Sequence, residues 1–426
     1  MQLKLDRKGL GTGQESQFSQ SSITRVILVR HGQSTYNAQK RYQGSCDDSV
    51  LTEKGHSDAY RTGVALKTIK LDAVYTSPLR RTQETTAEIL GGMKAEERRS
   101  NHLPRISTSP HLKEIDLPTW QGLTYKYVQE HFAADYRCWK ERPHAFQMPV
   151  SQVERQLKAG KGGSIPTLSE RQCFPVMDLY DRAHQFWQKI LPLHTTKTIL
   201  IVSHSGTIRA LISTVIAMAC EQYHVLQQSN CGISILNFPT PSYQQGQLEA
   251  MNLTTHLGEV LPKLKDGKQG LRLLLVPASG KQPHLLQKLA ERLQVVPIDF
   301  CLSSNVDSCQ QIAKQLLKYQ PKTLHLPVLG QDFTQIWQQF LSQRAALPSN
   351  DVDSTRPTTG LVVAYPSIIQ NMLSRVLCTS PPCLQLIPDT LSVIYYPLKS
   401  HNPVLQAMNI ANFTQESLAQ SNEHTR

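Results

Sequence analysis

Two apolar runs that each end in a histidine constrain this chain more than any other feature of its sequence. The run Arg25 to Val29 (RVILV) is rich in β-branched residues and stops at Arg30-His31-Gly32. The run Thr198 to Ser203 (TILIVS) stops in the same way at His204-Ser205-Gly206. Ligands of open α/β sheets bind beyond the carboxyl ends of the strands, so we predict that His31 and His204 share one pocket.

Helical segments follow these strands and complete an α/β pattern. Residues 51–66 begin with Thr52 three residues before Gly55, and residues 208–219 have apolar i, i+3, i+4 spacing. A further strand is expected over residues 71–75 and a helix over residues 83–90, with Arg81 between them. Repeated strand–loop–helix units predict an α/β fold, with a mostly parallel sheet flanked by helices.

These residue types suit phosphoryl transfer, which needs a nucleophile, cations on the phosphate oxygens and a proton donor. His31 is the candidate nucleophile, because neighbouring arginines disfavour its protonated form. Arg30 and Arg81 can bind phosphate oxygens bidentately, and His204 can donate to the same group. Glu114 is the candidate general acid, with Asp116 as the competing choice.

Four ordered motifs resemble those of the histidine phosphatase (phosphoglycerate mutase-like) superfamily. They are VRHGQSTYN from Val29, TSPLRRTQET from Thr76, EIDLPTWQGL from Glu114 and VSHSGTIRAL from Val202. The resemblance implies a phosphohistidine at His31, phosphate binding by Arg30, Arg81 and His204, and acid catalysis by Glu114. It further implies substrate contacts at Asn37, Gln43, Gly44 and Ser205.

The resemblance covers residues 24 to 240 and includes departures from the family pattern. Gln33 replaces the usual acidic residue, Trp120-Gln121-Gly122 replaces Trp-Glu-Gly, and no Gly-Gly-Glu-Ser element is recognisable near Gly163. These departures concern substrate choice more than the phosphate pocket. The stretches QGSCDDSVLT, KEIDLPTWQGL and LQQSNCGISIL are especially similar to plant 2-carboxyarabinitol-1-phosphate phosphatases and their cyanobacterial relatives.

The second half repeats the order of blocks found in the first half. Four segments of the second half echo, in order, the His31 strand, the strand before Arg81, the His204 strand and residues 230–235. They are residues 273–280, 299–304, 360–367 and 389–394. The repeat has Pro277 and Ala278 for Arg30 and His31, Ser308 for Arg81 and Tyr365 for His204. We predict a second, degenerate α/β half of similar fold, as in the relatives named above. Apolar strands shared by any two α/β domains are the alternative explanation.

The predicted organisation has four parts. Residues 1–23 form a polar leader, residues 24–265 the catalytic domain, residues 271–410 the degenerate domain, and residues 411–426 a disordered tail. Within the catalytic domain, residues 114–174 are rich in polar and aromatic side chains and include Gly160-Lys161-Gly162-Gly163-Ser164. We predict that they form a lid over the strand ends.

Composition and charge narrow the possible cellular location and binding partners of the protein. No apolar run approaches the roughly 18 residues of a membrane span, and the nine cysteines contain no CxxC pair, which favours a reducing cytoplasm. The net charge of +12 is spread along the chain, so we expect a phosphorylated small molecule as partner, and neither nucleic acid nor membrane. We expect no metal and no cofactor, and the oligomeric state stays open.

Three functions compete on this sequence. The first is a metal-independent phosphatase acting on a small phosphorylated metabolite through phosphohistidine at His31. The second is a phosphoglycerate mutase of the 2,3-bisphosphoglycerate-dependent type, for which the lid offers Lys126, Arg137, Lys140 and Arg142 but lacks recognisable mutase elements. The third is a regulatory or binding protein, chiefly through the C-terminal half.

Overall fold

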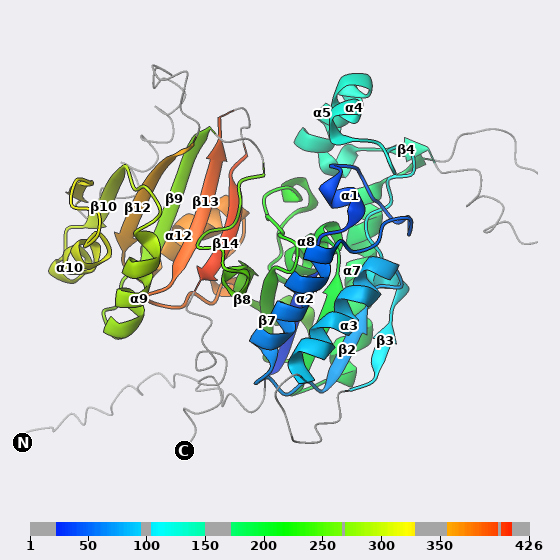
Figure 1. Ribbon diagram of the computed structural model, residues 1–426, viewed down its shortest axis with the longest axis horizontal. Helices are drawn as coiled ribbons and strands as arrows, with labels where there is room; N and C mark the ends of the chain where they lie inside the picture. Colours follow the sequence, from blue (N-terminus) through cyan, green and yellow to red (C-terminus); the bar gives the residue numbers. More distant parts are fainter. Residues whose placement is uncertain are drawn as a thin grey trace, which may run out of the picture.

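One mixed sheet runs through the whole molecule (Figure 1). The computed structural model describes residues 23–94, 104–149, 172–265, 269–328, 356–398 and 402–410 of the 426-residue chain. Over these residues the sheet has 12 strands in the order β11-β10-β12-β9-β13-β14-β8-β7-β1-β6-β2-β3. The first half contributes β1 (Thr24–Arg30), β2 (Ala73–Thr76), β3 (Ile106–Thr108), β6 (Thr198–Ser203), β7 (Ile233–Phe238) and β8 (Gln247–Leu253). The second contributes β9 (Gly270–Pro277), β10 (Phe300–Ser304), β11 (Leu324–Val328), β12 (Thr358–Ala364), β13 (Leu391–Pro397) and β14 (Val404–Ile410).

The parallel pair β1 and β6 lies at the centre of the first half, and its register places Arg30 beside Ser203. Both predicted strands are confirmed: β6 has the predicted bounds, and β1 is one residue longer at each end. Helix α8 (Ser205–Val215) differs from the prediction, because it begins directly after the extended residue His204. It ends before Ala219 since Ala217 adopts a left-handed backbone (φ 54°), which stops helix propagation.

Two other helices place the site loops. Helix α2 (Glu53–Leu66) is capped by Thr52, whose hydroxyl accepts a hydrogen bond from the Gly55 amide, as the sequence predicts. Helix α3 (Arg80–Lys94) begins three residues before the predicted start at Gln83. Arg81 therefore lies in the first turn of α3, at the carboxyl end of β2.

The core has two layers, one on each face of the sheet. Alternate residues of β1 face opposite sides, with Val26 and Leu28 in one apolar cluster and Ile27 and Val29 in the other. The first cluster includes residues of α7 (Pro175–Ile190), α8 and α12 (Pro366–Leu377). The second includes residues of α2, α3, α9 (Pro283–Leu293) and α10 (Asp307–Leu316). Both faces are thus covered by helices, which explains the continuous apolar runs of the central strands.

The two halves have the same topology. Read outward from the middle of the sheet, the orders are β8-β7-β1-β6-β2-β3 and β14-β13-β9-β12-β10-β11. The register also agrees, because Arg30 pairs with Ser203 as Pro277 pairs with Ala364. The amide of His31 donates to Ser203 O (2.9 Å), and the amide of Ala278 donates to Ala364 O (2.8 Å). Ala278 therefore occupies the place of His31 in the second half.

Part of the predicted lid lies within the described residues. It contains α4 (Tyr125–His131), α5 (Ala133–Glu141) and the short antiparallel pair β4 (Met148–Pro149) and β5 (Gln172–Cys173). Helices α4 and α5 lie near α1 (Thr35–Ala38), the helix that follows the His31 loop (Figure 1). The glycine tract at 160–164, the leader to residue 22 and the tail from residue 411 lie outside the described residues.

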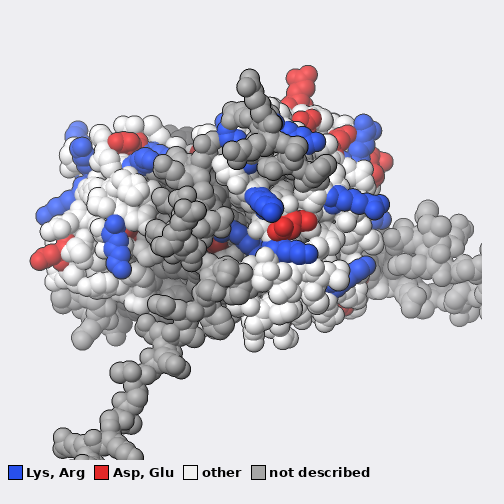
Figure 2. Space-filling view, turned by 90° about the horizontal axis from the view of Figure 1, so that it is seen from below, with Lys and Arg blue, Asp and Glu red and all other residues white. Residues whose placement is uncertain are grey.

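The described part of the chain exposes charged side chains of both signs. Lys and Arg side chains are dispersed over both halves in the view of Figure 2, with Asp and Glu among them. No described helix has the length and apolar character needed to cross a membrane.

Candidate active site

The loop after β1 is held by close backbone packing. The amide of Gly32 donates to Thr85 Oγ1 of α3 (2.9 Å). A Cβ on Gly32 would lie 2.5 Å from the carbonyl oxygen of Gly55, and a Cβ on Gly55 would lie 2.2 Å from the carbonyl oxygen of Gln33. Glycine at both positions therefore lets the His31 loop pack directly on the first turn of α2.

His31 is buried, with 1% of its surface exposed, and has a defined orientation. Its Nδ1 lies 2.7 Å from the carbonyl oxygen of Gly32, so Nδ1 carries the proton and Nε2 keeps its lone pair. Burial lowers the pKa of His31 well below the usual value, and the charges of Arg30 and Arg81 lower it further. The imidazole is thus neutral with Nε2 available, which is the form that a nucleophile requires.

Arg30 and Arg81 bring positive charge into this buried site. Arg30 Nη1 donates to Gln228 O (2.9 Å), while Arg81 Nη1 and Nη2 donate to Cys46 O (2.8 Å) and Gly44 O (3.0 Å). The Nε atoms of both arginines are buried without a hydrogen-bond partner. Within the described residues neither guanidinium pairs with a carboxylate, and burial lowers the pKa of both. The charge of Glu114 acts on both guanidiniums without forming an ion pair, so two buried cations still favour binding of an anion.

His204 faces His31 from the end of β6. The ring centroids are 5.2 Å apart with an interplanar angle of 62°. His204 Nε2 lies 2.8 Å from Ser77 Oγ, and Nδ1 is buried without a partner. Burial lowers the pKa of His204 well below its usual range, and Arg81, His31 and Arg30 add to this effect. A second neutral imidazole therefore lies beside the first.

Glu114 lies at the amino end of α8. Its Oε1 accepts from the Ile115 amide (2.9 Å) and the Thr207 amide (3.2 Å), and its Oε2 accepts from the Gly206 amide (3.2 Å). The Glu114 side chain is thus held by backbone amides in the first turn of α8, the helix that begins after His204. Arg182 Nη2 donates to the Glu114 carbonyl (3.1 Å) and fixes the backbone there.

Asp116, the competing acid, makes different contacts. It accepts from Ser45 Oγ (2.7 Å) and Gln121 Nε2 (3.0 Å), two residues of neighbouring loops. Gln121 is the residue that replaces the family's glutamate in the Trp-Glu-Gly element. Glu114, unlike Asp116, therefore adjoins the helix that begins after His204, and its role as the acid stays a prediction.

The predicted substrate-binding residues surround the two histidine loops. Asn37 Oδ1 accepts from Asn230 Nδ2 (3.0 Å) and from the Ser34 amide (3.3 Å). Gln43 Oε1 accepts from Ser34 Oγ (2.9 Å). Gly44 has a φ of 55° and accepts from Arg81, and Ser205 is the first residue of α8. Asn37 and Gln43 thus shape the loop, while their contact with a substrate remains a prediction.

Two residues that hold the site were not predicted from the sequence. Asn230 Nδ2 donates to His31 O (3.0 Å) and Gly32 O (3.1 Å), which fixes the His31 loop from 199 residues away. Ser77 orients His204 from the adjacent strand end. Ser77 lies within the TSPLRRTQET motif and Asn230 within the QQSNCG stretch. The two motifs therefore indicate that these segments belong to the site, but they do not predict the hydrogen bonds that Ser77 and Asn230 form there.

At the carboxyl ends of parallel strands, two buried imidazoles with lowered pKa values lie beside two buried guanidiniums that form no ion pair with a carboxylate among the described residues. This arrangement defines an α/β protein with an anion-binding group of side chains. The family model of the histidine phosphatase superfamily, branch 1, matches residues 26–161 and 166–254, more than half of the chain. The chain belongs to this superfamily, and the predicted resemblance is confirmed.

Named relatives align with about half of the chain. The probable 2-carboxy-D-arabinitol-1-phosphatase of Arabidopsis thaliana is 36% identical over 224 residues, covering 53% of this chain and 40% of that protein. Phosphoserine phosphatase 1 of Hydrogenobacter thermophilus is 27% identical over 237 residues, covering 56% of this chain and 96% of that protein. The solved structure of Bacillus stearothermophilus YhfR is 27% identical and covers 50% of this chain and 90% of that chain, with a TM-score of 0.40. The chain spans only about two fifths of the plant relative's length.

Proposed function

We propose that this protein is a phosphatase that hydrolyses a small phosphorylated metabolite through a phosphohistidine at His31. The single observation that supports it best is the pair of buried guanidiniums, Arg30 and Arg81, which have no carboxylate partner among the described residues and lie beside a neutral His31. A dianionic phosphate would compensate both charges and present phosphorus to His31 Nε2.

The reaction has two balanced steps. In the first, the His31 Nε2 lone pair forms a bond to phosphorus, the ester P–O bond breaks, and the leaving oxygen takes a proton from the Glu114 carboxyl group. In the second, water attacks phosphorus, gives its proton to the Glu114 carboxylate, and the N–P bond breaks to release inorganic phosphate. Arg30, Arg81 and His204 Nδ1 bind the phosphoryl oxygens throughout.

The proposed substrate carries a carboxylate as well as a phosphate. The two relatives are named for 2-carboxy-D-arabinitol 1-phosphate and for phosphoserine, both of which combine these groups. In this chain a further cation, Arg209, is close enough to perturb the pKa of both Arg30 and Tyr125. We therefore propose phosphorylated hydroxy or amino acids as the substrate class, to be tested by a screen of such esters against sugar phosphates that lack a carboxylate.

The mutase alternative shares every step up to the phosphohistidine. It differs in returning the phosphoryl group to a second hydroxyl of the substrate rather than to water. Incubation with 3-phosphoglycerate, with and without 2,3-bisphosphoglycerate, separates the two: we expect free phosphate and no isomer. Isomer formation without phosphate release would establish the mutase instead.

The remaining parts of the proposal concern the rest of the chain. The second half, residues 271–410, is non-catalytic, since Pro277, Ala278, Ser308 and Tyr365 stand where the first half has its phosphate ligands. Residues 114–174 form the lid. The protein works in a reducing cytoplasm, which is consistent with nine cysteines that are all free thiols.

Trapping the intermediate tests the function directly. Protein quenched during turnover of a labelled phosphate ester should retain label that is lost in acid and kept in alkali, as a phosphoramidate bond predicts. The His31→Ala variant should retain none and should release no phosphate, while remaining folded by circular dichroism. Label on the His31→Ala variant, or full activity in it, would exclude His31 as the nucleophile.

A further inference from the structure

The two halves meet through reciprocal contacts between the edge strands β8 and β14. Asn252 Nδ2 donates to the carbonyl oxygen of Gln406 (2.7 Å), and Asn409 Nδ2 donates to the carbonyl oxygen of Glu249 (2.6 Å). Both asparagines have a left-handed backbone, with φ of 54° and 56°. Each half therefore inserts one side-chain amide into the edge of the other, as an approximate twofold relation requires.

On the catalytic side these contacts continue into residues 225–231, which we call the 225–231 loop. The Leu405 amide donates to Val225 O (2.8 Å), and Leu405 O accepts from the Gln227 amide (2.9 Å). Gln406 Nε2 donates to Gln227 Oε1 (3.1 Å), and the Gln406 side chain is fully buried. The second half thus holds this loop by backbone and side-chain hydrogen bonds.

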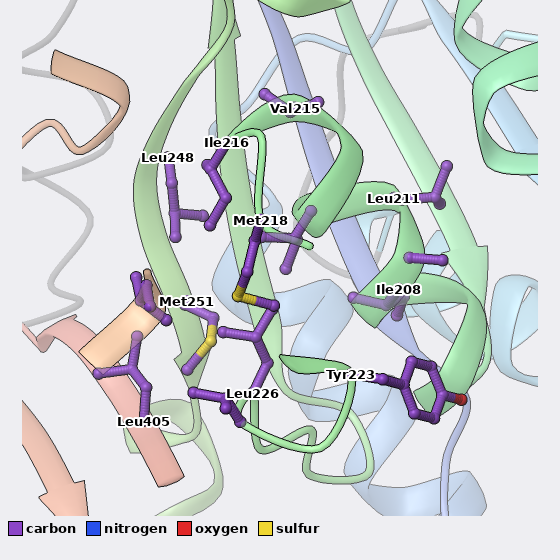
Figure 3. Packing of buried hydrophobic residues seen from close by; sticks show 14 of the residues in the cluster. Ile208, Leu211, Val215, Ile216, Met218, Tyr223, Leu226, Leu248, Met251 and Leu405 are labelled. Atoms are coloured by element: carbon purple, nitrogen blue, oxygen red, sulfur yellow. The ribbon is translucent and has the colours of Figure 1, made fainter. Parts of the chain in front are cut away.

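Apolar packing strengthens the same contact. Leu405 lies beside Met251 and Leu226, with Met218 and Leu248 close by (Figure 3). Leu226, Met251, Leu248 and Leu405 are fully buried. Separation of the two halves would expose apolar surface of these side chains to water, so apolar burial and hydrogen bonds together hold the second half on this surface.

The 225–231 loop also holds the catalytic residues. Gln228 O accepts from Arg30 Nη1 (2.9 Å), and Asn230 Nδ2 donates to the carbonyl oxygens of His31 (3.0 Å) and Gly32 (3.1 Å). The Ser229 amide between them donates to Asn252 Oδ1 (2.6 Å). A single loop therefore connects β14 of the second half with the phosphate ligand and the nucleophile of the first.

We propose that the second half is a built-in positioning partner for the active site. By fixing the 225–231 loop, Leu405 and Gln406 set the direction of the Arg30 guanidinium and of the His31 loop. In the reverse contact the Gln385 amide donates to Leu248 O (2.9 Å). Further along the same loop the Asp389 amide donates to Pro277 O (2.8 Å), beside Ala278, and neither of these two residues has a catalytic side chain. The contact between the halves thus affects catalysis only from the second half to the first. This inference rests on the proposed function, which assigns phosphate as the ligand of Arg30.

Matched variants of the full-length chain test this asymmetry. Asn252→Gly and Asn409→Gly each remove one of the two reciprocal amides, and glycine accepts the left-handed backbone at both positions without strain. Gln406→Ala removes a contact made only from the second half. The readouts are the affinity for inorganic phosphate, by calorimetry, the separate kcat and KM for a phosphate ester, and the melting temperature.

We expect similar falls in melting temperature for Asn252→Gly and Asn409→Gly but different effects on the site. Asn252→Gly and Gln406→Ala should weaken phosphate binding and raise KM about tenfold, whereas Asn409→Gly should stay within about twofold of wild type. Asn252→Gly also removes the Ser229 contact within the first half, so Gln406→Ala is the deciding variant. Wild-type phosphate affinity in Gln406→Ala, or equal losses in Gln406→Ala and Asn409→Gly, would overturn the positioning role alone. A wild-type protein that neither binds phosphate nor hydrolyses an ester would overturn the proposed function, and this inference with it.

Discussion

Ser77 Oγ lies 2.8 Å from His204 Nε2, and this contact determines which nitrogen of His204 can meet an anion. Ser77 Oγ accepts from the Leu79 amide (3.3 Å), so its own proton is free to be donated to Nε2. When Ser77 donates in this way, Nε2 is the acceptor and Nδ1 carries the ring proton. Because Nδ1 is buried and has no partner among the described residues, a neutral His204 can donate there to a phosphoryl oxygen.

The Ser77→Ala variant should lose activity because the tautomer of His204 is no longer fixed. We expect kcat/KM to fall by about tenfold or more, in line with the loss of an oriented donor to the transition state. Ser203→Ala is the matched control: its hydroxyl is equally buried and donates to Leu112 O (2.9 Å), away from the imidazole rings. Equal kcat/KM values in the two variants would show that the Ser77 contact does not orient His204.

Arg30→Met should abolish phosphate binding without lowering the stability of the ligand-free protein. The substitution removes a buried charge that has no carboxylate partner, and the Gln228 carbonyl that it leaves still accepts from Lys265 Nζ. We therefore expect a melting temperature equal to or above that of the phosphate-free wild type.

The same variant should lose the response to ligand. Phosphate at a hundred times its dissociation constant should stabilise the wild type by about 2.7 kcal/mol and should leave Arg30→Met unchanged. Thermal melts with and without phosphate give both quantities. A strongly destabilised Arg30→Met protein would mean that Arg30 is a structural cation rather than a phosphate ligand.

The ends of the two central strands were predictable because their signal is local. An apolar β-branched run that stops at a histidine needs no distant partner to be recognised, and β6 has the predicted bounds. Arg81 was predictable from an equally local pattern, a short apolar strand followed by a helix, although α3 begins three residues earlier than expected.

Other parts of the site depend on contacts that no local pattern carries. Asn230 donates to the His31 carbonyl from 199 positions further along the chain. Ser77 contacts His204, which is 127 positions away. The reciprocal amides of Asn252 and Asn409 depend on a left-handed backbone at both positions and on the pairing of two edge strands. Hydrogen-bond partners of this kind follow from tertiary packing, so the sequence predicts the reacting groups better than the residues that orient them.

Glu114→Gln should act on the leaving group. A glutamine cannot supply the proton that an alkoxide needs, so kcat for an alkyl phosphate should fall by about 100-fold or more. The first step with a p-nitrophenyl ester, measured as the burst of p-nitrophenol, should be affected far less because that leaving oxygen needs no proton, whereas the second step slows for both substrates. Asp116→Asn is the control, because its contacts with Ser45 and Gln121 lie away from α8. If Asp116→Asn rather than Glu114→Gln showed the leaving-group dependence, the acid would be Asp116.

Acid should destabilise this protein, and His256 allows the effect to be measured. Burial lowers the pKa of His256 to about 4, against about 6.5 in an unfolded chain. As the pH falls through 6.5 the unfolded state takes up a proton that the folded state does not, so stability is lost progressively down to about pH 4. The lowered pKa values of His31 and His204 act in the same direction.

His256→Gln should reduce this loss. His256 Nε2 lies 3.0 Å from Thr62 Oγ1, which itself donates to the Asp58 carbonyl, so the ring donates and a glutamine amide can replace it without titrating. Between about pH 7 and about pH 4.5 the variant should lose roughly 2 kcal/mol less of its unfolding free energy than the wild type, as measured by urea denaturation. Parallel pH curves for the two proteins would mean that His256 takes up its proton in the folded state as readily as in the unfolded chain.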